Sequence, residues 1–193
     1  NKAAKEMRKR IEEMVGTDAK NIWMGTFHSV FARLLRSEAA KLGYPVNFTI
    51  YDTEDSKSLI RTILKEEQLD SKLYNASFVY NRISGLKNNL ITPKQYLNDE
   101  EYISEDLANG RPKFGEIYLK YTSRCFKSGA MDFDDLLLKT HILLENFPEA
   151  LNKYQHQFKH VLIDEFQDTN RVQYLIVKRI AAATRNLSVE IGR

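Results

Sequence analysis

The 193-residue chain contains very little cysteine and no long apolar run. Its single cysteine, Cys125, excludes an internal disulfide framework and a cysteine-rich zinc site. No apolar run approaches the roughly 20 residues that a membrane-spanning helix needs. No secretory signal is visible, although the chain begins with Asn1 rather than Met, and a cytosolic protein is the default expectation. With 42% hydrophobic and 28% charged residues, the composition is typical of a globular protein and argues against disorder.

The net charge of +3 is small, but the charge is unevenly distributed. Basic residues are concentrated near the N-terminus and acidic residues lie later in the chain. The phosphate backbone of a nucleic acid would therefore bind preferentially to the N-terminal part of the chain. Charge alone favours the simpler alternative, a solvated helix face. The early basic residues are Lys2, Lys5, Arg8, Lys9, Arg10, Arg33, Arg36 and Lys41.

The spacing of apolar residues predicts mostly helices with a few short strands. We expect strands at residues 21–25, 48–50, 161–163 and 186–191, and a loop at 98–112, which is polar and has Gly and Pro near its end. Residues 50–125 show no strand alternation and are interpreted as a helical block inserted between strand-bearing parts. Helices are predicted at residues 2–15, 26–42, 114–125 and 148–158, and another carries the apolar stripe from Val79 to Leu90. Further helices are predicted to start after the capping residues Asp52 and Asp132, at Pro93, and after Thr169 or Asn170.

The sequence HVLIDEFQDTN, residues 160–170, places two adjacent acids after a buried-strand pattern. An Asp at the end of such a strand can hold Mg²⁺, and a neighbouring carboxylate can face the attacking water in nucleotide hydrolysis. Because side chains alternate along a strand, we expect Asp164 and Glu165 to point to opposite sides. The alternative, which this short pattern taken alone favours, is that the acids only stabilise the start of the next helix.

A second acidic group, Asp132, Asp134 and Asp135, has two interpretations. The three carboxylates could bind a metal ion, as in a nuclease. They also fit a capped helix start with acids near the helix dipole, and this is favoured because no fourth ligand with matching spacing is evident. Three histidines in the second half of the chain, His141, His156 and His160, show no recognisable zinc-ligand spacing.

Small polar residues near position 26 lie where a strand is expected to give way to a helix. Hydroxyl and backbone N–H groups at Thr26, His28 and Ser29 suit a phosphate. Trp23 and Phe27 could stack on bases, but their pattern is more typical of core residues, and a lone His28 is more often structural. Cys125 lies on an apolar stripe and is expected to be inert.

Four blocks in order resemble successive motifs of the UvrD/PcrA/Rep-type superfamily 1 DNA helicases. They are NKAAKEMR at residues 1–8, TFHS at 26–29, DFDDL at 132–136 and DEFQDTN at 164–170. The resemblance covers essentially the whole chain. The seven-residue DEFQDTN, followed by Arg171 and Gln173, is its most specific part.

This resemblance implies a helix-rich α/β fold. Residues 1–49 and 126–193 would form an incomplete RecA-like, P-loop NTPase lobe with a parallel sheet, and residues 50–125 a mostly α-helical insertion. The implied function is that of an ATP-dependent 3′–5′ DNA helicase that uses ATP and Mg²⁺. Its partners would be single-stranded DNA, junctions of single- and double-stranded DNA, a second motor lobe of the same protein and possible repair or replication proteins.

The resemblance also assigns roles to individual residues. Asp164 would coordinate magnesium and Glu165 would be the catalytic carboxylate. Gln167 and Asp168 would link the ATP site to neighbouring motifs. Asn1 and Lys2 would belong to one motif on the single-strand path, and Thr26, Phe27 and His28 to the next.

The chain departs from the family pattern at both ends. No GxxxxGK[ST] occurs in it, so the phosphate cradle is expected upstream of Asn1, and Glu190-Ile191-Gly192-Arg193 stands where a Gly-Asp segment would follow. We therefore expect a helicase fragment, inactive by itself and with a reduced sheet. Two alternatives remain: the motor part of a helicase–nuclease subunit, or a non-catalytic DNA- or protein-binding module if the chain is naturally complete.

Overall fold

The computed structural model describes residues 2–191, with side chains described from residue 5. Helices dominate this part of the chain, and its strands are three residues long. The helices are α1 (Lys2–Val15), α2 (Phe27–Glu38), α3 (Thr53–Glu66), α4 (Ala76–Asn88), α5 (Pro93–Leu97), α6 (Glu100–Ala108), α7 (Phe114–Lys127), α8 (Phe133–Asn146), α9 (Pro148–Gln157) and α10 (Arg171–Ala181). The 3₁₀ turns are η1 (Gly16–Asn21), η2 (Ala39–Leu42) and η3 (Phe166–Asp168), and the strands are β1 (Thr49–Tyr51), β2 (Ala130–Asp132), β3 (Val161–Ile163) and β4 (Leu187–Val189).

Helix starts follow the capping residues that the sequence provides. The side chains of Asp52, Asp132 and Asn170 each accept a hydrogen bond from the N3 backbone N–H, and the N3 side chain accepts one from the backbone N–H of the capping residue. Thr92 does the same before Pro93, the first residue of α5. The predicted starts of α3, α5 and α8 are confirmed, and Asn170, rather than Thr169, caps α10.

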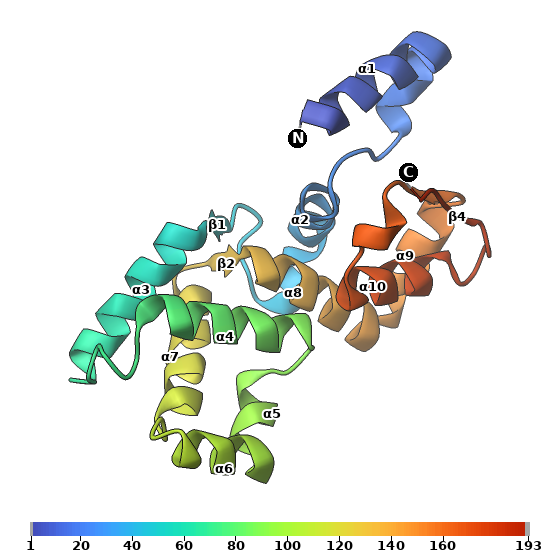
Figure 1. The fold of residues 1–193 in the computed structure, drawn as a ribbon. Helices are drawn as coiled ribbons and strands as arrows, with labels where there is room; N and C mark the ends of the chain where they lie inside the picture. Colours follow the sequence, from blue (N-terminus) through green and yellow to red (C-terminus); the bar gives the residue numbers. More distant parts are fainter. Residues whose placement is uncertain (1, 192–193) are drawn as a thin grey trace.

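The strands form two separate parallel pairs. β1 pairs with β2 in the register Thr49↔Ala130, and β3 pairs with β4 in the register Val161↔Leu187. Figure 1 shows β1 and β2 close to α3 and α8, away from β4 and the C-terminal end. The expected strands at residues 48–50, 161–163 and 186–191 are confirmed to within a few residues, as is the reduced sheet. Strand β2 was not expected.

Two predicted elements are wrong. Residues 21–25 form no strand, because the described strands pair only with each other and this segment has no partner strand among them. Residues 98–112 are not a loop, because they contain α6. Asp99 caps this helix by accepting from the N–H groups of Glu101 and Tyr102. The carboxylates of Glu100 and Glu101 interact favourably with the positive N-terminal end of the helix dipole.

The buried apolar residues form two clusters. One draws on residues 31–48 and 131–180 and includes Leu34, Leu35 and Leu143, all fully buried. The other draws on residues 60–125 and includes Ile63, Phe114 and Tyr118. The chain therefore leaves the first cluster after β1 and returns to it through β2.

Helix α1 projects away from the rest of the molecule (Figure 1). Its predicted apolar stripe is largely open to solvent, with Met7 39% and Met14 83% exposed. Among residues 2–191, no helix has both the length and the apolar character needed to cross a membrane.

Candidate functional site

The two adjacent acids lie just beyond the end of a strand. Strand β3 ends at Ile163, and Asp164 and Glu165 follow it, both exposed. The neighbouring segment fixes this loop on both sides. The N–H of Glu190 donates to the carbonyl of Ile163 (2.8 Å), and the N–H of Phe166 donates to the carbonyl of Glu190 (2.9 Å). The carboxylates are thus presented to solvent by a backbone that is held in place.

Glu165 has a left-handed backbone conformation, with φ of +52°. This conformation is costly for a residue with a Cβ and is concentrated at functional sites. The N–H of Glu165 donates to Asp164 Oδ1 (2.9 Å), and the side-chain amide of Gln167 donates to the Glu165 carboxylate. Strand alternation therefore does not set the direction of Glu165, contrary to the sequence argument, because the residue has already left the extended conformation.

The loop then turns tightly into a helix. The N–H of Asp168 donates to the carbonyl of Glu165 (2.9 Å), and that of Thr169 to the carbonyl of Phe166 (3.0 Å). Asp168 is exposed, whereas Asn170 is half-buried as the cap of α10. One short 3₁₀ turn therefore connects the acid pair to the helix cap.

The donors available at this loop suit magnesium better than a metal with an all-protein ligand set. Mg²⁺ is usually bound through one or two carboxylates together with waters and substrate phosphates. Asp164 and Glu165 provide two exposed carboxylates of that kind. Within the described residues, no three His, Cys, Asp or Glu side chains are grouped so that they could hold an ion by themselves.

Thr26 begins α2 and uses its side chain to do so. Its Oγ1 accepts from the N–H of Ser29 (3.3 Å), and the Ser29 hydroxyl donates to the Thr26 carbonyl (2.8 Å). Both residues remain exposed. Next to them, Phe27 is half-buried with its ring 5.8 Å from that of Phe31. Part of this motif is therefore structural, while its hydroxyl edge stays open to a ligand.

His28 lies edge-on against Phe133, the first residue of α8, with ring centroids 5.7 Å apart. Burial lowers the pKa of His28, and the nearby carboxylate of Asp134 opposes this shift only in part. Phe133 itself is 43% exposed. The TFHS and DFDDL segments therefore meet directly.

The first motif is only partly described. Asn1 lies outside the described residues, and for Lys2 the structure describes the backbone, within α1, but not the side chain. Of the other early basic residues, Arg8 donates to the carbonyl of Met24 (2.9 Å) and Arg36 to those of Val46 and Phe48. These guanidinium groups therefore support the local fold.

Cys125 is a core residue, and Trp23 is partly buried against the first hydrophobic cluster. The Trp23 ring lies 5.1 Å from Phe158, and the Arg33 guanidinium stacks 4.1 Å above it. Cys125 is 1% exposed, and burial raises the pKa of its thiol to about 12. The structural interpretation of both residues is confirmed.

The acidic group at residues 132–135 binds a lysine rather than a metal ion. Lys87 of α4 is 1% exposed, and its Nζ lies 2.6 Å from Asp132 Oδ2 and 2.9 Å from Asp135 Oδ1. The hydroxyl of Tyr121 on α7 also donates to Asp132 Oδ2 (2.8 Å). Asp132 and Asp135 in addition form the capping box of α8. The nuclease-like interpretation is therefore not supported, because the lysine occupies the position that a cation would take.

Charge and burial act against each other within this group. Burial by itself would raise the pKa of Asp132, but the charge and hydrogen bond of Lys87 outweigh it and the pKa is lowered. Burial and the charge of Asp132 raise the pKa of Asp135. For Lys87, the two carboxylates outweigh burial and raise the pKa, which keeps the ammonium charged.

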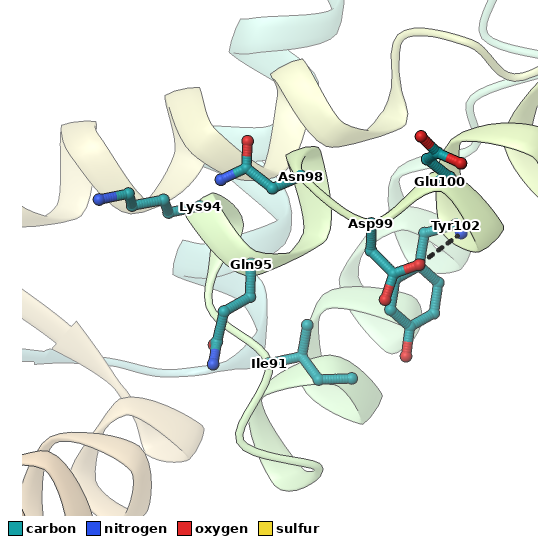
Figure 2. A pocket seen from close by; sticks show the side chains of 7 residues that line it. All are labelled: Ile91, Lys94, Gln95, Asn98, Asp99, Glu100 and Tyr102. Carbon is teal, nitrogen blue, oxygen red and sulfur yellow. Dashed lines mark hydrogen bonds between the residues drawn. The ribbon is translucent and has the colours of Figure 1, made fainter.

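An open hollow of about 720 Å³ lies elsewhere, between α5 and α6 (Figure 2). Its lining comes from residues 91–102 and includes none of the predicted site residues. Two of its polar side chains are occupied, because Gln95 accepts from the Thr92 N–H and Asp99 caps α6. Its wall carries both Lys94 and Glu100, so it favours neither anions nor cations.

Comparison with known proteins adds to this geometry. The model of the UvrD/REP helicase N-terminal domain matches residues 1–192. The chain belongs to this family. Two proteins named ATP-dependent DNA helicase PcrA, from Staphylococcus epidermidis strain ATCC 12228 and Staphylococcus aureus strain NCTC 8325, are each 42% identical over 190 residues. The matches cover 98% of this chain and 25% of each relative, so the chain spans about a quarter of their length.

This UvrD/REP helicase domain contains two notable residues that the sequence argument missed, Lys87 and Asn88. Asn88 is half-buried; its amide donates to Asp134 Oδ1 (2.7 Å), and its Oδ1 accepts from Asn170 Nδ2 (3.2 Å). A signal for Lys87 was present, because it lies four residues after Ile83 on the apolar face of α4, where a charge needs a partner. No comparable signal marks Asn88.

Proposed function

We propose that this chain is the ATP- and DNA-contacting part of an ATP-dependent DNA helicase that couples ATP hydrolysis to 3′–5′ movement along single-stranded DNA and to duplex unwinding. The observation that carries the proposal is the loop after β3, where Glu165 is held in a left-handed conformation by its hydrogen bonds and presented beside Asp164. Membership of the UvrD/REP family supports it. The complete activity belongs to the longer protein.

At the ATP site, Asp164 would hold Mg²⁺, which when bound neutralises charge on the β- and γ-phosphates. Glu165 would orient the attacking water and accept its proton. Gln167 would keep the Glu165 carboxylate in one orientation through their hydrogen bond. Asp168, exposed on the same 3₁₀ turn, would respond to neighbouring motifs. Because the chain contains no GxxxxGK[ST], other parts of the protein would supply the phosphate cradle.

At the DNA side, the exposed hydroxyl edge of Thr26 and Ser29 would meet the phosphate backbone. Phe27 and His28 would complete this contact, together with Asn1 and Lys2. Junctions of single- and double-stranded DNA would be the substrates, and repair or replication proteins and a second motor lobe the partners.

We also propose that residues 50–125 are a helical insertion into a RecA-like lobe formed by residues 1–49 and 126–193. The two hydrophobic clusters support this division, since one lies within residues 60–125 and the other on both sides of it. The parallel pairing of β1 with β2 brings the two ends of the insertion together.

The test is Glu165→Gln in the full-length protein. This change keeps the shape of the side chain and removes the carboxylate that would accept the proton. DNA-stimulated ATP hydrolysis should fall by about 10²-fold or more, while binding of a fluorescent ATP analogue stays near the wild-type value. Glu190→Gln, an exposed acid on the neighbouring segment, is the control and should leave both measurements unchanged.

Strand-displacement assays test the polarity. A duplex with a 3′ single-stranded tail should be unwound in the presence of ATP, and one with a 5′ tail should not. Near-normal hydrolysis by the Glu165→Gln protein would disprove the role of Glu165, and equal unwinding of both substrates would disprove the direction.

A further inference from the structure

Two adjacent residues at the C-terminal end of α4, Lys87 and Asn88, contact the part of the chain after residue 126. Lys87 is buried among the acids at the start of α8. Asn88, the last residue of α4, points to a different pair of segments: its amide donates to Asp134 Oδ1 (2.7 Å) and its Oδ1 accepts from Asn170 Nδ2 (3.2 Å). Lys87 fixes the helix end, and Asn88 then links the first turn of α8 to the cap of α10. The far ends of these two helices are joined separately, by Arg179 Nη2 and Glu145 Oε1 (3.5 Å).

The side chain of Asn88 is fully used in this position. Its Nδ2 donates to Asp134 and also to the Ser84 carbonyl (2.9 Å), and its Oδ1 accepts from Asn170. A primary amide offers two N–H groups and a carbonyl oxygen, so both N–H groups and the oxygen have partners. Such a side chain has one favoured orientation, so a displacement of either partner would also displace the other through the amide.

Each partner of Asn88 belongs to one of the two predicted sites. Asp134 follows Phe133, whose ring contacts His28 of the predicted DNA motif. Asn170 caps α10 and is one 3₁₀ turn away from Glu165. The residues His28, Phe133, Asp134, Asn88 and Asn170 thus form a continuous path of contacts between the two sites.

We propose that Asn88 is a positioning residue that couples occupancy of the DNA site at Thr26–His28 to the carboxylate loop at Asp164–Glu165. The inference rests on the proposed function. Bound DNA would fix His28 and Phe133, hence the first turn of α8, and Asn88 would pass this constraint to the cap of α10. Coupling between sites is measurable as a change in one activity caused by the ligand of the other.

The measurement is the stimulation factor of the full-length protein, the turnover rate of ATP with saturating single-stranded DNA divided by the rate without DNA. Asn88→Ala should lower this factor by between about 2-fold and 30-fold. The rate without DNA and the thermal unfolding temperature should change little. A purely structural role would lower both rates together and leave their ratio intact.

Asn89→Ala is the matched control. Asn89 is the next residue, exposed, and its amide donates only within the helix end, to the Gly85 carbonyl (2.8 Å). The factor should keep its wild-type value in this variant. An equal fall in both variants would overturn the proposal, because it would reflect general loosening of α4.

Variants at Asp134 test the same path from the α8 side, including the case in which Asn88→Ala fails to fold. Asp134→Ala should lower the factor, whereas Asp134→Asn retains the Oδ1 acceptor and should preserve it. The double variant Asn88→Ala/Asp134→Ala should have a stimulation factor no lower than that of the more impaired single variant, since both changes break the same path.

A wild-type factor in both Asn88→Ala and Asp134→Ala would overturn the inference while leaving the helicase proposal intact. Absence of DNA stimulation in the wild-type full-length protein would instead overturn the proposed function, and the coupling with it. The two failures are therefore distinguishable.

Discussion

The Lys87 ammonium lies 2.6 Å from Asp132 Oδ2 at a site where both residues are almost completely buried. Lys87 comes from α4 and Asp132 from β2, so this ion pair connects the two hydrophobic clusters. Tyr121 of α7 donates to the same oxygen. The helical block is thus attached to the rest of the chain by a charged contact as well as by packing.

Lys87→Met should destabilise the chain strongly. The methionine fills similar space but leaves Asp132 and Asp135 buried without their cation. Breaking a buried ion pair on one side typically costs about 3–5 kcal/mol. Urea unfolding followed by circular dichroism measures the loss.

The matched change at an exposed lysine, Lys94→Met, should stay within about 0.5 kcal/mol of wild type. Adding Asp135→Asn to Lys87→Met should recover part of the loss, because it removes one of the uncompensated charges. An unfolding midpoint for Lys87→Met equal to that of Lys94→Met would refute this account.

The loss of folding stability at acid pH should depend on Glu38, the last residue of α2. It is 4% exposed and accepts from Lys153 Nζ (2.6 Å) and the Tyr154 hydroxyl (3.1 Å), with Lys41 Nζ at 2.9 Å. Burial by itself would raise the pKa of Glu38, but these partners outweigh it and the pKa lies below its ordinary value of 4.5. The unfolded chain therefore binds the proton more readily than the folded one.

This stabilisation is present above pH 4.5 and is lost as the pH falls through the lowered folded-state pKa. Glu38→Gln should reduce stability near pH 7 and flatten its fall between about pH 5 and the lowered pKa. Unfolding curves at a series of pH values measure the slope. Glu149→Gln, an exposed acid on α9, should keep the wild-type slope, and an unchanged slope in Glu38→Gln would contradict the assignment.

Cys125 should resist thiol reagents in the folded chain. It is buried in the cluster of residues 60–125, and its pKa of about 12 leaves almost no thiolate at neutral pH. Because it is the single cysteine, mass spectrometry after labelling of the 193-residue chain reports this site alone. We expect labelling to be slow in buffer and complete in denaturant. Equally rapid labelling in both conditions would show that the cluster is open.

Two substitutions at Thr26 separate its capping role from its proposed DNA contact. Asn and Asp both serve well as helix caps, so Thr26→Asn and Thr26→Asp should keep α2 stable. Only Thr26→Asp places a negative charge beside the phosphate backbone. Its affinity for single-stranded DNA in the full-length protein should fall several-fold at low salt, and the difference should shrink as salt is raised. Equal affinities of the two variants would argue against a phosphate at this position.

Local signals predicted much of the secondary structure. Asp52, Thr92, Asp132 and Asn170 were expected as helix starts or among the candidates, because a cap and its partner are only three residues apart. The strand at residues 21–25 was wrong because an apolar run does not show whether a partner strand exists. Helix α6 was missed because glycine and proline near the end of the segment outweighed a capping aspartate and two acids at its beginning.

The sequence by itself determined the family, the helix starts and the identity of the candidate residues, since motifs and caps are encoded in neighbouring positions. Only the tertiary structure decided what the acids at 132–135 bind and how the two candidate sites are connected. Lys87 is 45 residues from Asp132, and Asn88 is 82 residues from Asn170. Contacts over such separations form only when the packing of α4 against α8, and of α8 against α10, brings their ends together. No local pattern encodes that arrangement.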